Sequence, residues 1–444
     1  MQSHSRTCFI AMSRTLCLGM ALVFLSACAS YSQSFSPVER NLFDNDPAKA
    51  LETLDKQDYP KRDMFLYYSN KALLLRMLGQ FSESNKQLEL AKNIITEFSA
   101  TSVSEESSAF IINDATRSYI GSPVEQIMLH IYAALNYLEL NDRDAARVEV
   151  LQVDIRLKEL TQENPDSALS IDPFAHYLSG IIYEDLHEWS DALIAYRKSY
   201  EAYLSHNQLY TIAVPLQLKQ SLILMSHKVG IKDELNKYEK EFEIKLSDLI
   251  SKNPGSELVF IFHNGLAPIK REHAIQVLSP VSGKFIRIAL PSYESRSNFV
   301  AKAKININNE ISQTTELAED IASLQIKTLQ QHTPAITARA IARAVAKYKI
   351  ADNAGDQSPV AGLLVNVIGL VTERADTRSW LTLPAEIQVA RIKLPAGEYR
   401  LDIELLNDSD NMVMQPQSVN IRISDQHKHY LSWHRIANTI STRH

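Results

Sequence analysis

The stretch that decides the fold of the N-terminal half is Met64–Thr96, which reads MFLYYSNKALLLRMLGQFSESNKQLELAKNIIT. Small residues suit positions where the two helices of a hairpin approach closely, and large residues fill the space between neighbouring hairpins. The stretch has both kinds at fixed spacing, so it predicts a hairpin of two packed helices. The residues concerned are Tyr68, Ala72, Leu75, Gly79, Phe81, Ser84, Leu88 and Ala91.

The same spacing recurs along the chain and is typical of a tetratricopeptide repeat. An earlier second helix is predicted at Pro47–Leu51, because Ala50 and Ser84 are 34 positions apart (84 − 50), which is the length of such a repeat. A weaker unit surrounds Gly230. Residues 35–253 are therefore predicted to form a tetratricopeptide-like array. The two clearest further copies contain Ala134, Tyr137, Asn141, Ala146 and Val150, and then Gly180, Tyr183, His187, Trp189, Ala192 and Tyr196.

One insertion interrupts the array. Ser84 and Ala146 are 62 positions apart (146 − 84), and Ser99–Ser108 between them is rich in Ser and Glu. Long insertions in repeat arrays form loops on one face, often the binding face. We expect Ser99–Ser108 to be either such a loop or a disordered segment.

The hydrophobic period changes from 3.6 to 2 after Asn253-Pro254-Gly255, a strong stop signal. Short segments rich in Val, Ile and Phe, bounded by turn residues, then follow one another, as in an antiparallel sandwich. The whole chain is thus predicted to be multidomain, α followed by α+β: the helical array, then a β-sandwich-like domain over residues 256–440. The predicted strands are Glu257–His263, Ala274–Leu278, Lys284–Leu290, Phe299–Ile307, Ile387–Leu394, Tyr399–Leu406 and Ser418–Ser424.

A helical insertion is predicted within this strand-rich domain, at about residues 316–372. Glu316–His332 is amphipathic, and Pro334 opens a second predicted helix that continues through Tyr348. Val360–Val371 is nearly all apolar but too short to span a membrane. It is expected either to be buried or to lie at a membrane surface.

The N-terminus reads as a secretory signal. Arg6 and Arg14 precede an apolar run, Leu16–Leu25, and no acidic residue occurs before Cys28. Leu25-Ser26-Ala27-Cys28 resembles the bacterial lipobox, whose cysteine becomes the lipid-modified first residue of the mature protein. This resemblance implies a signal peptide over 1–27, with translation starting at Met1 or Met12, lipidation of Cys28 and a tether over 28–34. Ala29 lacks the Asp of an inner-membrane retention signal, which implies the periplasmic face of the outer membrane.

Composition limits the possible functions. Of the three cysteines, Cys8 and Cys17 leave with the signal peptide and Cys28 carries lipid, so neither disulfides nor thiol chemistry are expected. Without Arg6 and Arg14, 44 basic residues (46 − 2) face 52 acidic ones, a net charge of −8. Such a chain is not expected to bind nucleic acid, which requires a basic surface.

No catalytic, cofactor or metal-binding motif occurs in the sequence, so neither catalysis, a cofactor nor a metal is predicted. Two groups of residues are candidates for partner binding. Asp376, Arg378 and Trp380 could form an interaction hot spot, or Asp376 and Arg378 could pair while Trp380 packs in the core. Arg339 and Arg343 lie on one face of a predicted helix and could meet an acidic partner or lipid phosphates, or simply face solvent.

Three segments resemble a family of bacterial outer-membrane lipoproteins to which no activity is assigned. They are Asn113–Gly121 (NDATRSYIG), Glu257–Lys270 (ELVFIFHNGLAPIK) and Ala375–Gly397 (ADTRSWLTLPAEIQVARIKLPAG). The resemblance covers most of the mature chain. Because the family is associated with genes for lipoprotein activators of penicillin-binding proteins, it implies a role in the envelope or in peptidoglycan.

Three hypotheses about function follow. The first is a non-enzymatic scaffold, held at the membrane by the lipid on Cys28, that binds a periplasmic or envelope protein or peptide in envelope assembly or maintenance. The second places a module that binds cell-wall glycans or peptides, or a hydrolase, in the strand-rich half. The third is transport or assembly of an envelope polymer. The sequence determines neither the partner nor the oligomeric state.

Overall fold

The computed structural model describes residues 31–111, 114–163, 172–206, 212–250, 256–278, 283, 285–357, 374–425 and 427–436. Three predicted features lie outside these residues: the lipobox with Cys28, the boundary tripeptide at 253–255 and the apolar segment 360–371. No helix within the described part of the chain is long and apolar enough to cross a membrane.

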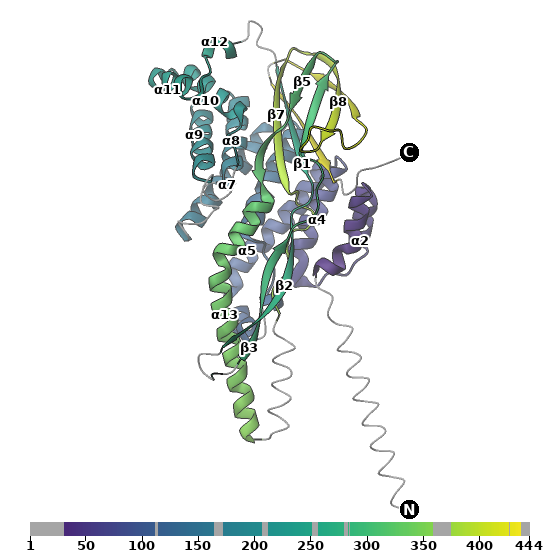
Figure 1. Cartoon of the computed structure of the whole chain (residues 1–444), viewed down its shortest axis with the longest axis vertical. Coiled ribbons are helices and arrows are strands. Elements are labelled where there is room, and N and C mark those ends of the chain that lie inside the picture. Colours follow the sequence, from purple (N-terminus) through teal and green to yellow (C-terminus); the bar gives the residue numbers. More distant parts are fainter. Residues whose placement is uncertain are drawn as a thin grey trace, which may run out of the picture.

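The N-terminal half is a succession of antiparallel helical hairpins, as predicted (Figure 1). Four pairs of consecutive helices pack together, α4 with α5, α6 with α7, α8 with α9 and α10 with α11, and α2 packs on α3. The helices are α2 (Tyr31–Phe43), α3 (Pro47–Asp55), α4 (Met64–Met77), α5 (Phe81–Ile111), α6 (Pro123–Glu139), α7 (Arg143–Glu163), α8 (Pro173–Asp185), α9 (Trp189–His206), α10 (Leu216–Val229), α11 (Lys232–Phe242) and α12 (Leu246–Leu249).

The turns between paired helices repeat one geometry. Gly79, Asn141, His187 and Gly230 all have positive φ, between 59° and 84°. In each case the next residue donates its N–H to the carbonyl five positions earlier, at 2.8–2.9 Å, as in a Schellman motif. Because Asn141 and His187 take the place of glycine, the repeat is recognised from its spacing more reliably than from a glycine at this turn.

Close helix–helix approach also occurs at the predicted small residues. Ser84, Ala146 and Ala192 are fully buried, and the Ser84 hydroxyl donates to the Ala72 carbonyl at 2.7 Å. A Cβ on Gly180 would lie 2.4 Å from the Tyr196 ring, so the α8–α9 hairpin requires glycine there. The predicted register of the repeats is therefore confirmed by packing.

The insertion within the array is not a loop. Helix α5 continues through Ser99–Ser108 to Ile111, and neither Gly nor Pro occurs between Phe81 and Ile111 to end it. The expectation of a loop or disordered segment was wrong. The segment is polar, but polar residues can continue a helix where neither Gly nor Pro interrupts it.

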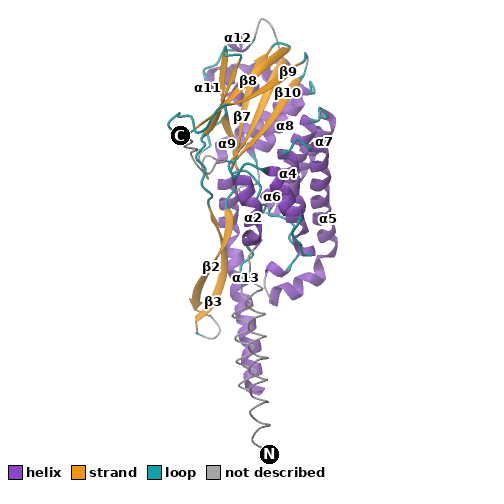
Figure 2. Ribbon diagram, turned by 90° about the vertical axis from the view of Figure 1, so that its right-hand side faces the viewer, coloured by secondary structure: helices purple, strands orange, loops and turns teal. Residues whose placement is uncertain are grey.

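The strand-rich half contains two facing four-stranded sheets and a separate two-stranded ribbon (Figure 2). The sheets have the orders β10-β1-β7-β6 and β5-β4-β8-β9, and apolar side chains from both fill the space between them. The strands are β1 (Ser256–Asn264), β2 (Ile269–Leu278), β3 (Phe285–Glu294), β4 (Lys302–Ile307), β5 (Ile311–Thr314), β6 (Glu316–Asp320), β7 (Glu386–Leu394), β8 (Gly397–Leu406), β9 (Gln417–Ile423) and β10 (Lys428–Arg435).

The sandwich departs from the prediction at its edge. Strand β10 was not predicted, and it pairs with β1 in parallel, so the first sheet is mixed whereas the second is antiparallel. Its sequence, KHYLSWHR, carries too many polar residues to read as a core strand. Those residues are accommodated because one face of β10 meets polar side chains of the helices.

The helical insertion also differs from the prediction. Glu316–Asp320 is strand β6, paired with β7, and not the start of a helix. One helix, α13 (Ile321–Gln357), follows it directly, and Pro334 lies inside this helix instead of opening a second one. The Asp320 carboxylate accepts the Ser323 N–H at 2.8 Å, which accounts for the helix start at this point.

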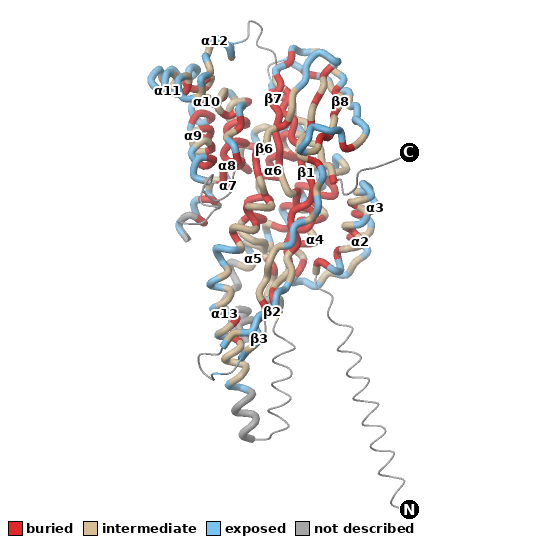
Figure 3. The backbone as a smooth tube through the Cα atoms, in the orientation of Figure 1, coloured by how far each residue is buried: buried red, intermediate tan, exposed pale blue. Residues whose placement is uncertain are grey.

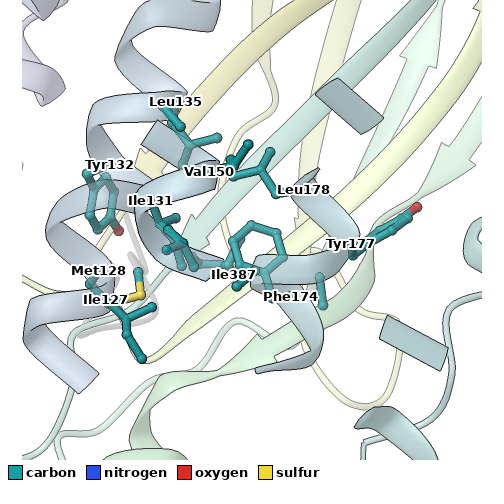
Figure 4. Close-up of a cluster of buried hydrophobic side chains, with 14 of the residues drawn as sticks. Ile127, Met128, Ile131, Tyr132, Leu135, Val150, Phe174, Tyr177, Leu178 and Ile387 are labelled. Carbon is teal, nitrogen blue, oxygen red and sulfur yellow. The ribbon is translucent and has the colours of Figure 1, made fainter. Parts of the chain in front are cut away.

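The two halves share one hydrophobic core. A single buried cluster contains Tyr132 and Phe174 from the helices together with Val259 of β1 and Ile387 of β7. Figure 4 shows Ile387 among the helical side chains, and Figure 3 shows buried residues concentrated where the helices meet β1 and β7. The predicted change of period at residue 253 is therefore not a division between independent cores.

Candidate functional site: the two faces of the helical array

The first helix of each hairpin faces the strand-rich half. Four of these helices, α4, α6, α8 and α10, each make a polar contact with it across a large sequence separation. The inner face of the array, which a free repeat protein would offer to a ligand, is thus covered by the chain's own strands and the segment before β7. The contacts are Asn70 with Thr382 (3.0 Å), Glu125 with Trp380 (2.8 Å), Asp185 with Lys428 (2.8 Å) and Ser221 with Arg391 (2.7 Å).

A buried group of four charges joins α8 to the mixed sheet. Arg391 of β7 lies 2.8 Å from both Glu184 of α8 and Glu257 of β1, and Lys428 of β10 contacts both carboxylates. Burial alone would raise the pKa of the Glu257 carboxyl, but the charges of Arg391 and Lys428 hold that pKa well below its ordinary value. Burial would likewise raise the pKa of the Glu184 carboxyl, but Arg391 and Lys428 lower it, so both carboxylates are charged beside two basic side chains.

The sequence does not reveal this cluster because its members are far apart in the chain. Arg391 and Glu184 are separated by 207 positions. One signal was available: Arg391 lies in the strand sequence EIQVARIKL with apolar Val389, Ala390 and Ile392 beside it. A charged residue in a strand buried on both faces indicates a buried partner.

A second buried polar group joins α4 and α6 to β1 and β10. Arg76 of α4 donates to Ser432 of β10, and the hydroxyl of Tyr132 lies 3.2 Å from Nδ1 of His263. The rings of His263 and His434 stack with centroids 4.0 Å apart. Burial is the main reason that the pKa of His263 lies well below its ordinary value, and the neighbouring His434 and Arg76 lower this pKa further. This imidazole is therefore neutral.

Of the predicted partner-binding residues, Arg378 and Trp380 lie inside the molecule and Asp376 is partly buried. Arg378 forms ion pairs with Asp376 (2.7 Å) and with Asp63 of the helical half (2.9 Å), and only 5% of it is exposed. Trp380 is 1% exposed, and its indole N–H donates to Thr382. The hot-spot interpretation is corrected, because these side chains bind another part of the same chain.

The predicted basic face on α13 is divided by burial. Arg339 is exposed, whereas Arg343 is buried with 2% exposure. The expectation that both face solvent or a partner is therefore wrong for Arg343. The helix periodicity was identified correctly, but the packing of β3 against α13 was not visible in the sequence.

The outer face of the array carries an exposed apolar stripe that the sequence did not single out. Val148, Leu151 and Ile155 of α7 are spaced i, i+3 and i+7, and their exposed fractions are 54%, 38% and 48%. They lie on a second helix of a hairpin, whereas the first helices contact the sheet. We call these three residues the α7 stripe.

A pocket of about 240 Å³ lies where α2, α3 and α4 meet the end of β10. Arg76, Trp433, His434 and Arg435 contribute to its lining, so it combines an aromatic ring with basic groups. Within the described ranges, no three His, Cys, Asp or Glu side chains gather where they could hold a metal ion.

Comparison with known proteins does not assign the chain to a family. No protein-family model and no curated protein matches the chain. A structure of MamA 41-end from Desulfovibrio magneticus RS-1 is 14% identical, covering 48% of this chain and 90% of its own, with a TM-score of 0.29. BtubC (BKLC) from P. vanneervenii is 14% identical, covering 55% and 92%, with a TM-score of 0.32. Similarity this low carries no argument, so the repeat assignment rests on the turns and packing of this chain.

Proposed function

We propose that this protein is a lipid-anchored scaffold of the bacterial cell envelope that binds a protein partner on the outer face of its helical array, without catalysis. The supporting observation is the contrast between the two faces of that array. Its inner face is filled by the chain's own strands, whereas the α7 stripe on the outer face is exposed. Exposed apolar side chains grouped on one helix face are typical of protein contacts.

The inner face is a poor candidate for the partner site. A peptide could reach it only by displacing β1, β7 or β10, and would thereby separate Arg391 from Glu184. Leaving such buried charges unpaired is strongly unfavourable. The outer face requires no rearrangement of the fold.

The location belongs to the same proposal. The lipobox at Leu25–Cys28 supports an acyl anchor on Cys28, and Ala29 supports the periplasmic face of the outer membrane. Stable anchoring by two or three acyl chains would keep the scaffold at the membrane. Its partner would then be a periplasmic or envelope protein.

The pocket beside β10 supports a second candidate function, binding of a cell-wall glycan or peptide. Trp433 supplies an aromatic ring and Arg435 a charged group of the kinds that such ligands require. This ligand would bind at the junction of the two halves instead of on the α7 stripe.

Photocrosslinking in living cells separates the two candidates. A photoreactive amino acid at Leu151 or Ile155 should give a discrete protein adduct, and the same residue at exposed Lys232 on α11 should not. A third position, Asn45, lines the pocket. Adducts from Asn45 alone, or equal labelling from Lys232 and Leu151, would contradict partner binding at the stripe.

A further inference from the structure

An arm projects from the body of the molecule. It consists of the ribbon formed by β2 and β3 and of helix α13 up to Ile350. Both extend away from the sandwich in the same direction, and β3 packs along α13 (Figures 1 and 2). The arm comprises Ile269–Leu278, Phe285–Glu294 and Ile321–Ile350.

The charge of α13 is unlike that of the rest of the protein. Residues 321–350 include no Asp or Glu, although the chain as a whole has a net charge of −6. A helical stretch with basic and no acidic residues attracts anionic surfaces such as acidic lipid headgroups. Asp352 and Asp356 lie beyond this stretch, in the last turns of α13. Its basic residues are Lys327, Arg339, Arg343, Lys347 and Lys349, of which Arg343 is buried.

The end of the ribbon is apolar and exposed. Leu278 and Phe285 are directly opposite each other in the β2–β3 register, with exposed fractions of 61% and 74%. Ile275 is 42% exposed, and Ile350 of α13 is 48% exposed. Apolar side chains beside basic groups are the combination that binds the interface of a bilayer.

The proposed anchor would hold the bilayer close to this arm. Ser32, in the first turn of α2, lies 3.4 Å from Arg271 at the base of the ribbon. Cys28 precedes Tyr31 by three residues, which span at most about 10 Å when fully extended. From Arg271 to Leu278 the ribbon runs for seven residues, or about 23 Å. A lipid on Cys28 would therefore hold the base of the ribbon near the membrane surface, within the reach of an arm of this length.

We propose that the arm is a second membrane contact, which lies on the lipid surface with its basic helix against anionic headgroups and inserts Leu278 and Phe285 among the acyl chains. The proposal rests on the proposed function for the position of the anchor. It commits to a bilayer containing anionic phospholipid as the occupant of this surface. The anchor and the arm together would fix the orientation of the α7 stripe relative to the membrane.

The test uses the full mature chain with Cys28→Ser, so that no lipid contributes to binding. Flotation with vesicles of phosphatidylethanolamine and phosphatidylglycerol should recover the protein, and high salt should weaken the recovery. Vesicles of phosphatidylcholine alone should recover much less. The double variant Leu278→Ser, Phe285→Ser should bind about tenfold more weakly or worse, because two exposed apolar side chains are lost. Arg339→Gln with Lys349→Gln should remove most of the preference for anionic vesicles.

Matched controls carry the same substitutions elsewhere. Val148→Ser with Leu151→Ser, and Lys232→Gln with Lys240→Gln, should bind as the parent does. Equal loss in the controls, or no flotation of the parent with anionic vesicles, would overturn the arm proposal. Neither result bears on the lipid anchor, which is tested in cells by fractionation of the Cys28 variant, so the two failures can be told apart.

Discussion

Arg391 of β7 and Glu184 of α8 form an ion pair with their nitrogen and oxygen 2.8 Å apart, and this pair connects the strand-rich half to the inner face of the helical array. The Arg391 side chain is 4% exposed, so the pair is shielded from water. A buried pair of this kind does little for stability in itself but is costly to break from one side.

Arg391→Ala should therefore lower the free energy of unfolding by about 3–5 kcal/mol, because Glu184 and Glu257 would keep buried charges without their partner. Urea denaturation followed by circular dichroism measures the change. Arg400→Ala is a suitable control, since Arg400 pairs with Asp402 on the surface and should matter little. A mild effect at Arg391 would mean that the two halves are not coupled through this cluster.

Ala192→Trp should destabilise the array by about 1–3 kcal/mol, because Ala192 is fully buried between α8 and α9 and a large side chain forces them apart. Ile194→Trp, two positions further on the same helix, is the control because Ile194 is 47% exposed. Thermal melts compare the two. If Ala192→Trp melted like the control, the register of the third hairpin would be wrong.

A fragment of residues 35–252 should not form a stable native domain. Repeat arrays fold from contacts between neighbours, but here the first helices pack on Val259, Ile387 and Val389 of the strands. Removing the strands would expose this apolar surface to water. We expect helical circular dichroism with a broad melt and strong binding of a hydrophobic dye, whereas sharp, cooperative melting without dye binding would argue for independent cores.

Glu319→Gln should make the stability of the protein less dependent on pH. Burial is the main reason that the pKa of the Glu319 carboxyl lies well above its ordinary value of 4.5, and the nearby Asp172 raises this pKa further. The folded chain therefore retains a proton that the unfolded chain releases, so the free energy of unfolding contributed by Glu319 falls as pH rises above about 4.5. Melts between about pH 5 and pH 8 should decline less steeply for the variant. The exposed control Glu310→Gln should keep the parental slope.

Cys28→Ala should release the protein from membranes or leave it unprocessed, because the proposed acyl anchor would attach to that sulfur. Incorporation of labelled palmitate and fractionation of cells measure the effect. Unchanged fractionation with the outer membrane would contradict the anchor.

Local features of the fold could be predicted from the sequence, and non-local ones could not. The hairpin frame depends on residues within one repeat, so Ser84, Ala146 and Ala192 were placed correctly. Strand β1 pairs with β10, and the two are about 170 residues apart in the sequence. The hydrophobic period within one segment gives no information about such a pairing. The environment of a charged residue is equally non-local. Arg343 is buried although its helix face was expected to meet solvent or a partner. For Arg378 the sequence suggested the pair with Asp376 as one of two alternatives, but not the second pair with Asp63, 315 positions away.

The place of β10 in the mixed sheet has a consequence for synthesis of the chain. This strand carries Lys428 and Ser432, which complete the contacts with α8 and α6, and it adds the parallel edge next to β1. Until residues 428–435 have been made, the inner faces of α4, α6 and α8 are without part of their covering, however early those helices form. Chains interrupted before Lys428 should therefore be held by chaperones or removed by proteases, and completion of the last strand would mark a molecule as ready for use.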